Sequence, residues 1–348
     1  MSAAPAPAPL APWLQRQLTQ LLPMRGHALL LAGPSGLGQY ELALALARAW
    51  LCEQPMPQGA CGSCASCHAI DVHTHADLCV LMPETVSLEM GWPLDEGAQK
   101  DIDDKKRKPS KFIRVEAARQ VVSFAQMTPA RGRGKVVLVF PAERMNIESA
   151  NTLLKTLEEP AGDVRFVLAT EAVHQLLPTI RSRCVTQVLP WPETQEAVGW
   201  LRQAALARGV KRADDEAEAA TWLRAAGGRP SDALALAMQG VGAEQWDRLP
   251  ADIARGDWGA MADWPPARQL DVLQKLCHDL LAVGAGGRAR YFDAARLPGP
   301  AHPWRLSAWA RELREAARTV EHPFQAGLLQ QAWASRAQRA LSRYTRRS

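Results

Sequence analysis

Apolar residues recur along the chain in two rhythms, and the rhythm changes near residue 190. Between about Trp13 and Leu189, short apolar and β-branched runs alternate with helical segments. Four runs are predicted to be buried strands: 28–32, 78–82, 136–140 and 164–169. Because helical patterns lie between the strands, this part of the chain predicts a parallel sheet with helices packed on it.

Beyond Pro190, Trp191 and Pro192, where we expect a hinge, the pattern is helical. Three short helices are predicted first, each with a polar or proline start and a glycine stop: 194–209, 214–227 and 230–240. Stripes such as Leu270–Leu273–Leu280 and Trp309–Leu313 follow, and they predict helix–helix packing. The expected organisation is a disordered N-terminus, an α/β domain, a three-helix lid and a helical domain: 1–12, 13–190, 191–247 and 248–348.

Residues 84–111 interrupt the α/β pattern. The stretch from Lys100 to Pro109 is dense in charge and predicts an exposed insertion. Nothing in its composition assigns it a function.

The charge of the 348-residue chain is +5, and the C-terminal part accounts for the excess. From Ala301 to Ser348 there are nine arginines and three glutamates, which sum to +6. Such a segment is most often the solvated face of helices, with contact to nucleic acid as the alternative. We predict no signal peptide at the Ala/Pro-rich start and no apolar run long enough for a membrane span.

Residues Gly33 to Tyr40 have the frame of a phosphate-binding loop, G-x-x-x-x-G-K-[ST], between a predicted strand and a helix. Gly33 and Gly38 are in place. However, Gln39 stands where the phosphate-binding lysine is needed, and Tyr40 stands where a small hydroxyl holds Mg²⁺. The loop is therefore either a nucleotide site that has lost its chemistry or a glycine-rich turn that never bound a nucleotide.

Four of the seven cysteines follow the loop's helix closely: Cys52, Cys61, Cys64 and Cys67. Four thiolates at this spacing favour tetrahedral coordination of structural zinc, with free thiols or an iron–sulfur cluster as alternatives. Cys79, Cys184 and Cys277 are expected to be buried thiols. This clustering indicates a reducing compartment, which suits a cytoplasmic protein.

Two further runs, Asn151–Pro160 and Ser182–Cys184, carry a resemblance to a known family. With the loop and the cysteines they make the chain similar to the clamp-loader subunits of bacterial DNA polymerase III, and most to the delta-prime subunits. The resemblance covers residues 27 to about 234. It implies an AAA+ fold, which is a RecA-like α/β domain with a zinc-binding insertion, a helical lid and a helical collar.

The resemblance also implies roles for single residues. The acidic pair that serves magnesium and water is replaced by Phe140 and Pro141, and the lid arginine by Ser231. Thr170 stands at the sensor-1 position, after a strand. Arg183, in Ser-Arg-Cys, is the one nucleotide-handling residue left, as an arginine finger that reaches a neighbouring subunit's phosphate.

The expected function is therefore that of a clamp-loader subunit without ATPase activity of its own, inside a DNA-directed DNA polymerase holoenzyme. It would carry structural zinc, bind no ATP and be cytoplasmic, at the nucleoid-associated replisome. Its partners would be the gamma or tau ATPases, the delta subunit, primer–template DNA and, indirectly, the sliding clamp. The alternatives are an active ATPase of the gamma/tau kind and a zinc-bearing DNA-binding module.

Overall fold

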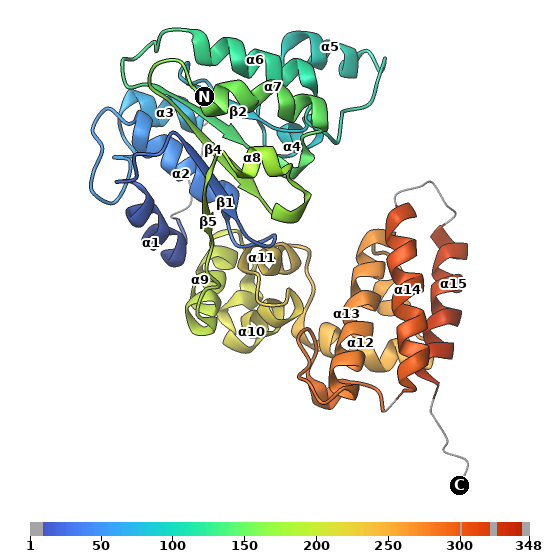
Figure 1. The fold of residues 1–348 in the computed structure, drawn as a ribbon. Coiled ribbons are helices and arrows are strands. Elements are labelled where there is room, and N and C mark those ends of the chain that lie inside the picture. Colours follow the sequence, from blue (N-terminus) through green and yellow to red (C-terminus); the bar gives the residue numbers. More distant parts are fainter. Residues whose placement is uncertain (1–9, 300, 321–325, 343–348) are drawn as a thin grey trace. The chain divides into compact units, whose positions relative to one another are not determined.

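The computed structural model describes residues 10–299, 301–320 and 326–342 (Figure 1). The chain divides into two compact units between Pro192 and Glu193. Most of the N-terminal segment that the sequence predicts to be disordered, residues 1–9, lies outside the described residues. The first helix begins at Pro12 and buries Trp13 and Leu14.

A parallel sheet of five strands forms the centre of the first unit, as the strand–helix alternation predicts. The strand order is β2-β3-β4-β1-β5. The strands are β1 (Ala28–Ala32), β2 (Leu78–Leu81), β3 (Lys135–Val139), β4 (Val164–Thr170) and β5 (Val185–Val188). Strand β5 was not predicted: it is an edge strand whose valines, Val185 and Val188, are exposed, so it shows no buried apolar run.

Helices cover both faces of this sheet. The first unit contains these helices: α1 (Pro12–Leu21), α2 (Gln39–Leu51), α3 (Ala65–Asp71), α4 (Glu84–Glu89), α5 (Glu96–Asp103), α6 (Val115–Gln126), α7 (Ile147–Glu158) and α8 (Pro178–Arg181). Helices α6 and α7 pack on one face through a core that includes Leu153, Val137 and Phe166. Helix α2 lies on the other face, where Ala47 and Leu51 meet Val136.

The insertion at 84–111 is folded and is not simply an exposed loop. Helix α5 buries none of its side chains, as its charge predicts. Glu84 and Trp92, however, are only 9% and 8% exposed. The insertion thus buries Glu84, Ser87 and Trp92, although its composition is otherwise that of a solvated surface.

The second unit is all helical. Its helices are α9 (Thr194–Ala207), α10 (Glu216–Ala225), α11 (Pro230–Met238), α12 (Ala243–Arg255), α13 (Pro266–Gly284), α14 (Pro303–Thr319) and α15 (Ala326–Leu341). Leu201, Trp222 and Ala233 share one core among α9, α10 and α11. Leu273 and Trp309 belong to a second core that joins α12 to α15. The division of this unit into a lid and a collar stays a prediction. No helix of the described residues has the length and apolar character that crossing a membrane requires.

Candidate nucleotide site and metal centre

The loop between β1 and α2 has the shape of a phosphate-binding loop, but its own side chain occupies it. The amide of Gln39 donates to the carbonyl oxygens of Gly33 at 2.7 Å and Pro34 at 2.8 Å. Gln39 is 2% exposed. Gly38 has a φ of 99°, and a Cβ there would lie 2.4 Å from Leu14 Cδ1, so helix α1 packs directly against the loop. The loop is closed by neutral contacts within the chain.

Tyr40 and Phe140, which stand at two positions that the resemblance assigns to magnesium binding, belong to an aromatic cluster. The rings of Tyr40 and Phe140 lie 5.3 Å apart. The insertion adds Trp92, whose Nε1 donates to the Tyr40 hydroxyl at 2.7 Å and whose ring stacks on His73 at 3.8 Å. Burial raises the pKa of Tyr40 to about 12, so its hydroxyl stays neutral. None of these four side chains presents a carboxylate to a metal.

The sensor-1-like hydroxyl is also satisfied inside the chain. Thr170, at the end of β4, is fully buried and donates to Glu143 at 2.7 Å. The Glu143 carboxylate accepts the backbone N–H of Glu171 as well, at 3.3 Å. Glu143 is half-buried and holds the end of β4 through these bonds.

Arg183 lies between α8 and β5 and is held by its own subunit. Its Nε and Nη2 donate to the Glu158 carboxylate at 3.0 and 2.8 Å, and its Nη1 donates to the Thr179 carbonyl at 3.0 Å. The side chain keeps 29% exposure. Sequence reasoning singled out Arg183 and missed Glu158, although both lie in the runs that carry the resemblance. Nothing in a separation of 25 residues says that they meet.

The lid position expected to hold an arginine carries Ser231, in the first turn of α11. The nearby Arg229 is bound locally. Its Nε donates to the Ala226 carbonyl at 2.8 Å and lies 3.0 Å from the Asp232 carboxylate. It therefore serves the start of its own helix.

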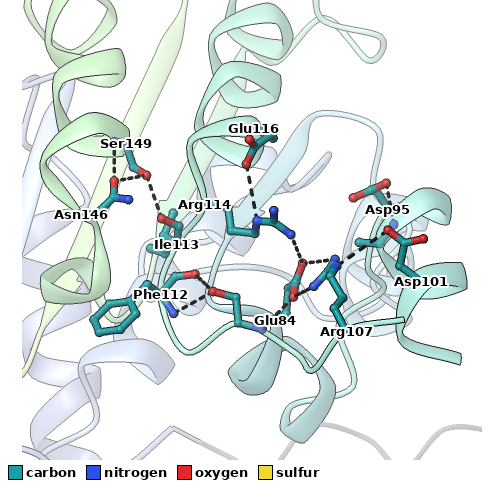
Figure 2. A network of polar contacts seen from close by, with 12 residues as sticks. Glu84, Asp95, Asp101, Arg107, Phe112, Ile113, Arg114, Glu116, Asn146 and Ser149 are labelled. Carbon is teal, nitrogen blue, oxygen red and sulfur yellow. Dashed lines mark hydrogen bonds and ion pairs between the residues drawn. The ribbon is translucent and has the colours of Figure 1, made fainter. Parts of the chain in front are cut away.

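The insertion is closed at its base by an ion network around Glu84 (Figure 2). Arg107 donates to both Glu84 oxygens, at 2.5 and 2.7 Å, and Arg114 lies 3.8 Å away. The backbone N–H of Ser110 donates to the same carboxylate at 2.8 Å. Burial by itself raises the pKa of Glu84, but these donors outweigh it, so the pKa lies below its ordinary value.

The four predicted cysteines converge on one point. Their sulfur atoms all lie within 4.8 Å of one another. The Sγ–Sγ distances are 3.8 Å from Cys52 to Cys64, 3.8 Å from Cys52 to Cys67 and 4.0 Å from Cys61 to Cys67. A tetrahedral ion with metal–sulfur bonds of about 2.3 Å places its thiolates roughly 3.8 Å apart. The cluster therefore fits a tetrahedral metal ion.

Backbone N–H groups donate hydrogen bonds to two of the four sulfur atoms that would bind the metal. The N–H of Cys61 donates to Cys52 Sγ, and the N–H of Cys67 donates to Cys64 Sγ at the start of α3. The N–H of Ser63 lowers the pKa of Cys61 to about 6, whereas burial raises that of Cys67 to about 12. Binding four thiolates therefore releases protons, and metal affinity falls as the pH falls.

Comparison with known proteins places the chain among DNA polymerase III subunits. The family model described as "DNA polymerase III, delta subunit" matches residues 14–192. The chain is 39% identical over 304 residues to the DNA polymerase III subunit delta' of Pseudomonas aeruginosa, covering 80% of this chain and 81% of that protein. It is 34% identical to the Escherichia coli subunit delta', covering 71% and 67%. It is also 34% identical to the E. coli subunit tau, but that match covers 46% of this chain and 21% of tau.

Proposed function

The chain belongs to the delta-prime family of DNA polymerase III subunits, and we propose that it serves a sliding-clamp loader as a subunit that does not bind or hydrolyse ATP. One observation carries the proposal: Gln39 closes the phosphate-binding loop from inside while Arg183 is kept at the surface. A chain built in this way has nothing to catalyse at its own loop. Its nucleotide chemistry has to be done for a neighbour.

The proposed role of Arg183 follows from its charge and shape. A planar guanidinium can donate two hydrogen bonds to phosphate oxygens and offset the charge that develops on a transferring phosphoryl group. Exposed pairs such as Arg183–Glu158 contribute only about 0–1 kcal/mol, so little free energy opposes the exchange of Glu158 for a phosphate. Hydrolysis at the neighbour would then require that the two subunits be closed together.

The metal is proposed to be zinc. Zinc supports tetrahedral four-thiolate sites, and with all four positions filled by protein the site has no place for a substrate. The ion would crosslink the end of α2 to α3, since Cys52 caps the first helix and Cys64 caps the second. Its contribution would be to folding and not to catalysis.

The proposed partners are the gamma or tau ATPases, the delta subunit and primer–template DNA, with the sliding clamp as an indirect partner. The helices from about residue 248 onward would form the collar that joins this chain to the other subunits. The place of work would be the cytoplasm, at the replisome on the nucleoid. The whole assembly would be a DNA polymerase holoenzyme, in which this chain is not itself the enzyme.

The test is the steady-state ATPase rate of reconstituted clamp loaders, with clamp and primed DNA, that contain Arg183→Ala. At the site that Arg183 completes, the rate should fall by about 10³–10⁵-fold, while assembly and metal content are unchanged. Arg183→Lys should recover little, because an ammonium lacks the planar fork. A wild-type rate for the alanine variant would contradict the proposal. Micromolar Mg²⁺-dependent ATP binding by the isolated chain would instead support an active ATPase.

A further inference from the structure

A cleft of about 990 Å³ opens at the amino-terminal edge of the sheet, where β3 and β4 begin. It lies at the opposite edge from the phosphate-binding loop. Its walls come from the ends of α1 and α2, the loop after Cys52 and the loop before β3. Apolar side chains such as Leu22 and Met56 line it together with Arg131, Arg133 and Arg165.

The cleft is positively charged. Arg131, Arg133 and Arg165 line it against one aspartate, Asp163, and Glu53 pairs with Arg131 from outside the lining, so these five charges sum to +1. Arg165 Nε is 4.0 Å from Asp163, at the limit of an ion pair. Lys135 also borders the cleft, but it is 3% exposed and its ammonium lies 4.0 Å from the centroid of the Phe124 ring, so its charge is turned away from a ligand in the cleft.

The loop that carries two of these arginines is fixed before any ligand arrives. The fully buried Asp77 accepts the backbone N–H groups of Ala130 and Arg131 at 2.7 and 2.8 Å. Gly134 has a φ of 81°, and a Cβ there would lie 2.6 Å from the Asp163 carbonyl oxygen. The loop is thus pressed against the start of β4. A preformed site loses less free energy on ordering when it binds.

The cysteine cluster builds the opposite wall. Pro55, Met56 and Pro57 lie in the loop between Cys52 and Cys61. Glu53, next to Cys52, pairs with Arg131 at 3.0 Å, and its carbonyl oxygen accepts from Arg133 Nη2 at 2.6 Å. The module that fits a metal ion therefore holds both the apolar wall and the arginines in place.

The chemistry of the walls decides which ligand fits. Single-stranded nucleic acid is usually gripped by stacking its bases on exposed aromatic faces. The one aromatic side chain here, Trp50, is half-buried and already has the Arg165 guanidinium 5.0 Å from its ring. The other apolar side chains of the lining are aliphatic and suit an aliphatic side chain: Leu22, Pro23, Ala49, Pro55, Met56, Pro57 and Val136. Arginine forks suit carboxylates.

We propose that this cleft binds a short acidic segment of a partner protein, with a large aliphatic side chain between carboxylates. The metal module keeps the two sides of the cleft at the separation that such a segment needs. The cysteine cluster would then have a purpose beyond stability, because it shapes a docking surface. This surface is separate from the loop and from Arg183.

The probe is a fluorescein-labelled peptide, Ala-Glu-Asp-Leu-Glu-Leu, titrated with the full chain at about 0.15 M salt and followed by fluorescence polarisation. The wild type should bind it with a Kd on the order of 10–100 µM. Arg133→Glu with Arg165→Glu should weaken binding by about tenfold or more. The control, Lys100→Glu with Arg119→Glu, makes the same charge change at exposed sites elsewhere and should stay within about twofold.

Two further arms complete the test. A peptide with Gln and Asn in place of Glu and Asp should not bind, and removal of the metal with a chelator should abolish binding until zinc is restored. The proposal is overturned if the wild type shows no saturable binding up to about 1 mM. Equal losses in both double variants would overturn it too. So would a labelled oligothymidylate that needs the same two arginines when the peptide does not bind.

Discussion

The two ends of the strands differ in whether the chain fills the space beside β1 and β3. At the carboxyl ends of the strands, where open α/β sheets usually bind ligands, Gln39, Tyr40, Phe140 and Trp92 occupy the space. At the amino ends, a basic cleft stays open and Arg183 is partly exposed. A fold places a site, but the side chains decide whether it is usable. In this chain the open cleft lies at the amino ends of the strands, where the fold alone does not predict a site.

The structure at the amino ends of the strands should depend most on the metal for its stability. Cys67→Ser removes a buried thiolate, and we expect it to lower the free energy of unfolding by about 3–5 kcal/mol, because metal binding contributes to folding. Elemental analysis should find the metal lost, and chemical denaturation should measure the cost. Cys79→Ala is the control and should keep one metal per chain. If Cys67→Ser leaves stability unchanged, the amino-terminal edge does not rely on a metal.

The packing at the carboxyl ends of the strands should depend on the insertion for its stability. Trp92→Ala removes a side chain that is 8% exposed, its bond to Tyr40 and its stack on His73. We expect a loss of about 3 kcal/mol in chemical denaturation. Trp304→Ala, at a side chain that is 65% exposed, should cost about 0.5 kcal/mol or less.

Calorimetry should still detect no ATP binding by Trp92→Ala, because Gln39 remains bonded inside the loop. Magnesium-dependent ATP binding by this variant would contradict the view that side chains of the loop itself fill the carboxyl ends of the strands. It would mean that the insertion alone closes an otherwise working site.

The sequence predicted the parts of this molecule that repeat a local pattern. Four strands, the loop and the cysteine cluster follow from runs and spacings that are short in sequence. The pairing of Glu158 with Arg183 and of Trp92 with Tyr40 joins segments 25 and 52 residues apart. No local pattern encodes such contacts, because they depend on how the whole sheet is assembled.

The insertion shows why composition misleads. Its charge predicts an exposed insertion, and helix α5 is indeed exposed. The insertion is held by the buried side chains of Glu84, Ser87 and Trp92, and none of them stands out against so many charges. The edge strand β5 was not predicted from the sequence for the opposite reason. A strand can form by pairing with β1 without burying its valines, so it leaves no buried apolar run to recognise.

The base of the insertion offers a smaller, pH-dependent test. Glu84→Gln weakens the charge-assisted bonds from Arg107, and we expect a cost of about 1–3 kcal/mol at neutral pH. The pKa of Glu84 is lowered below its ordinary value of 4.5, so its stabilisation is complete above pH 4.5 and is lost as the pH falls through the lower, folded-state pKa.

Denaturation of both proteins at several pH values should therefore show a difference that shrinks below pH 4.5. Glu116→Gln is the control, because its carboxylate is exposed and lies 3.5 Å from Arg114. It should change stability little at any pH. A constant difference for Glu84→Gln across the same range would mean that the charge of Glu84 does not matter.

The smallest effect is expected for the ion pair between Arg183 and Glu158, at the amino ends of the strands. In its proposed role Arg183 would leave Glu158 to reach a neighbour's phosphate, and breaking this exposed pair costs about 0–1 kcal/mol. Glu158→Gln should therefore change stability by less than about 1 kcal/mol and raise the ATPase rate of the assembled loader by at most about fivefold, which is what 1 kcal/mol is worth. Glu159→Gln, one residue further along, is the matched control and should leave the rate unchanged. If Glu158→Gln instead lowers the rate as far as Arg183→Ala does, Glu158 aims the guanidinium and does not compete for it. The amino ends of the strands would then hold Arg183 in place as the carboxyl ends hold Gln39. The difference is that Arg183 is partly exposed whereas Gln39 is buried.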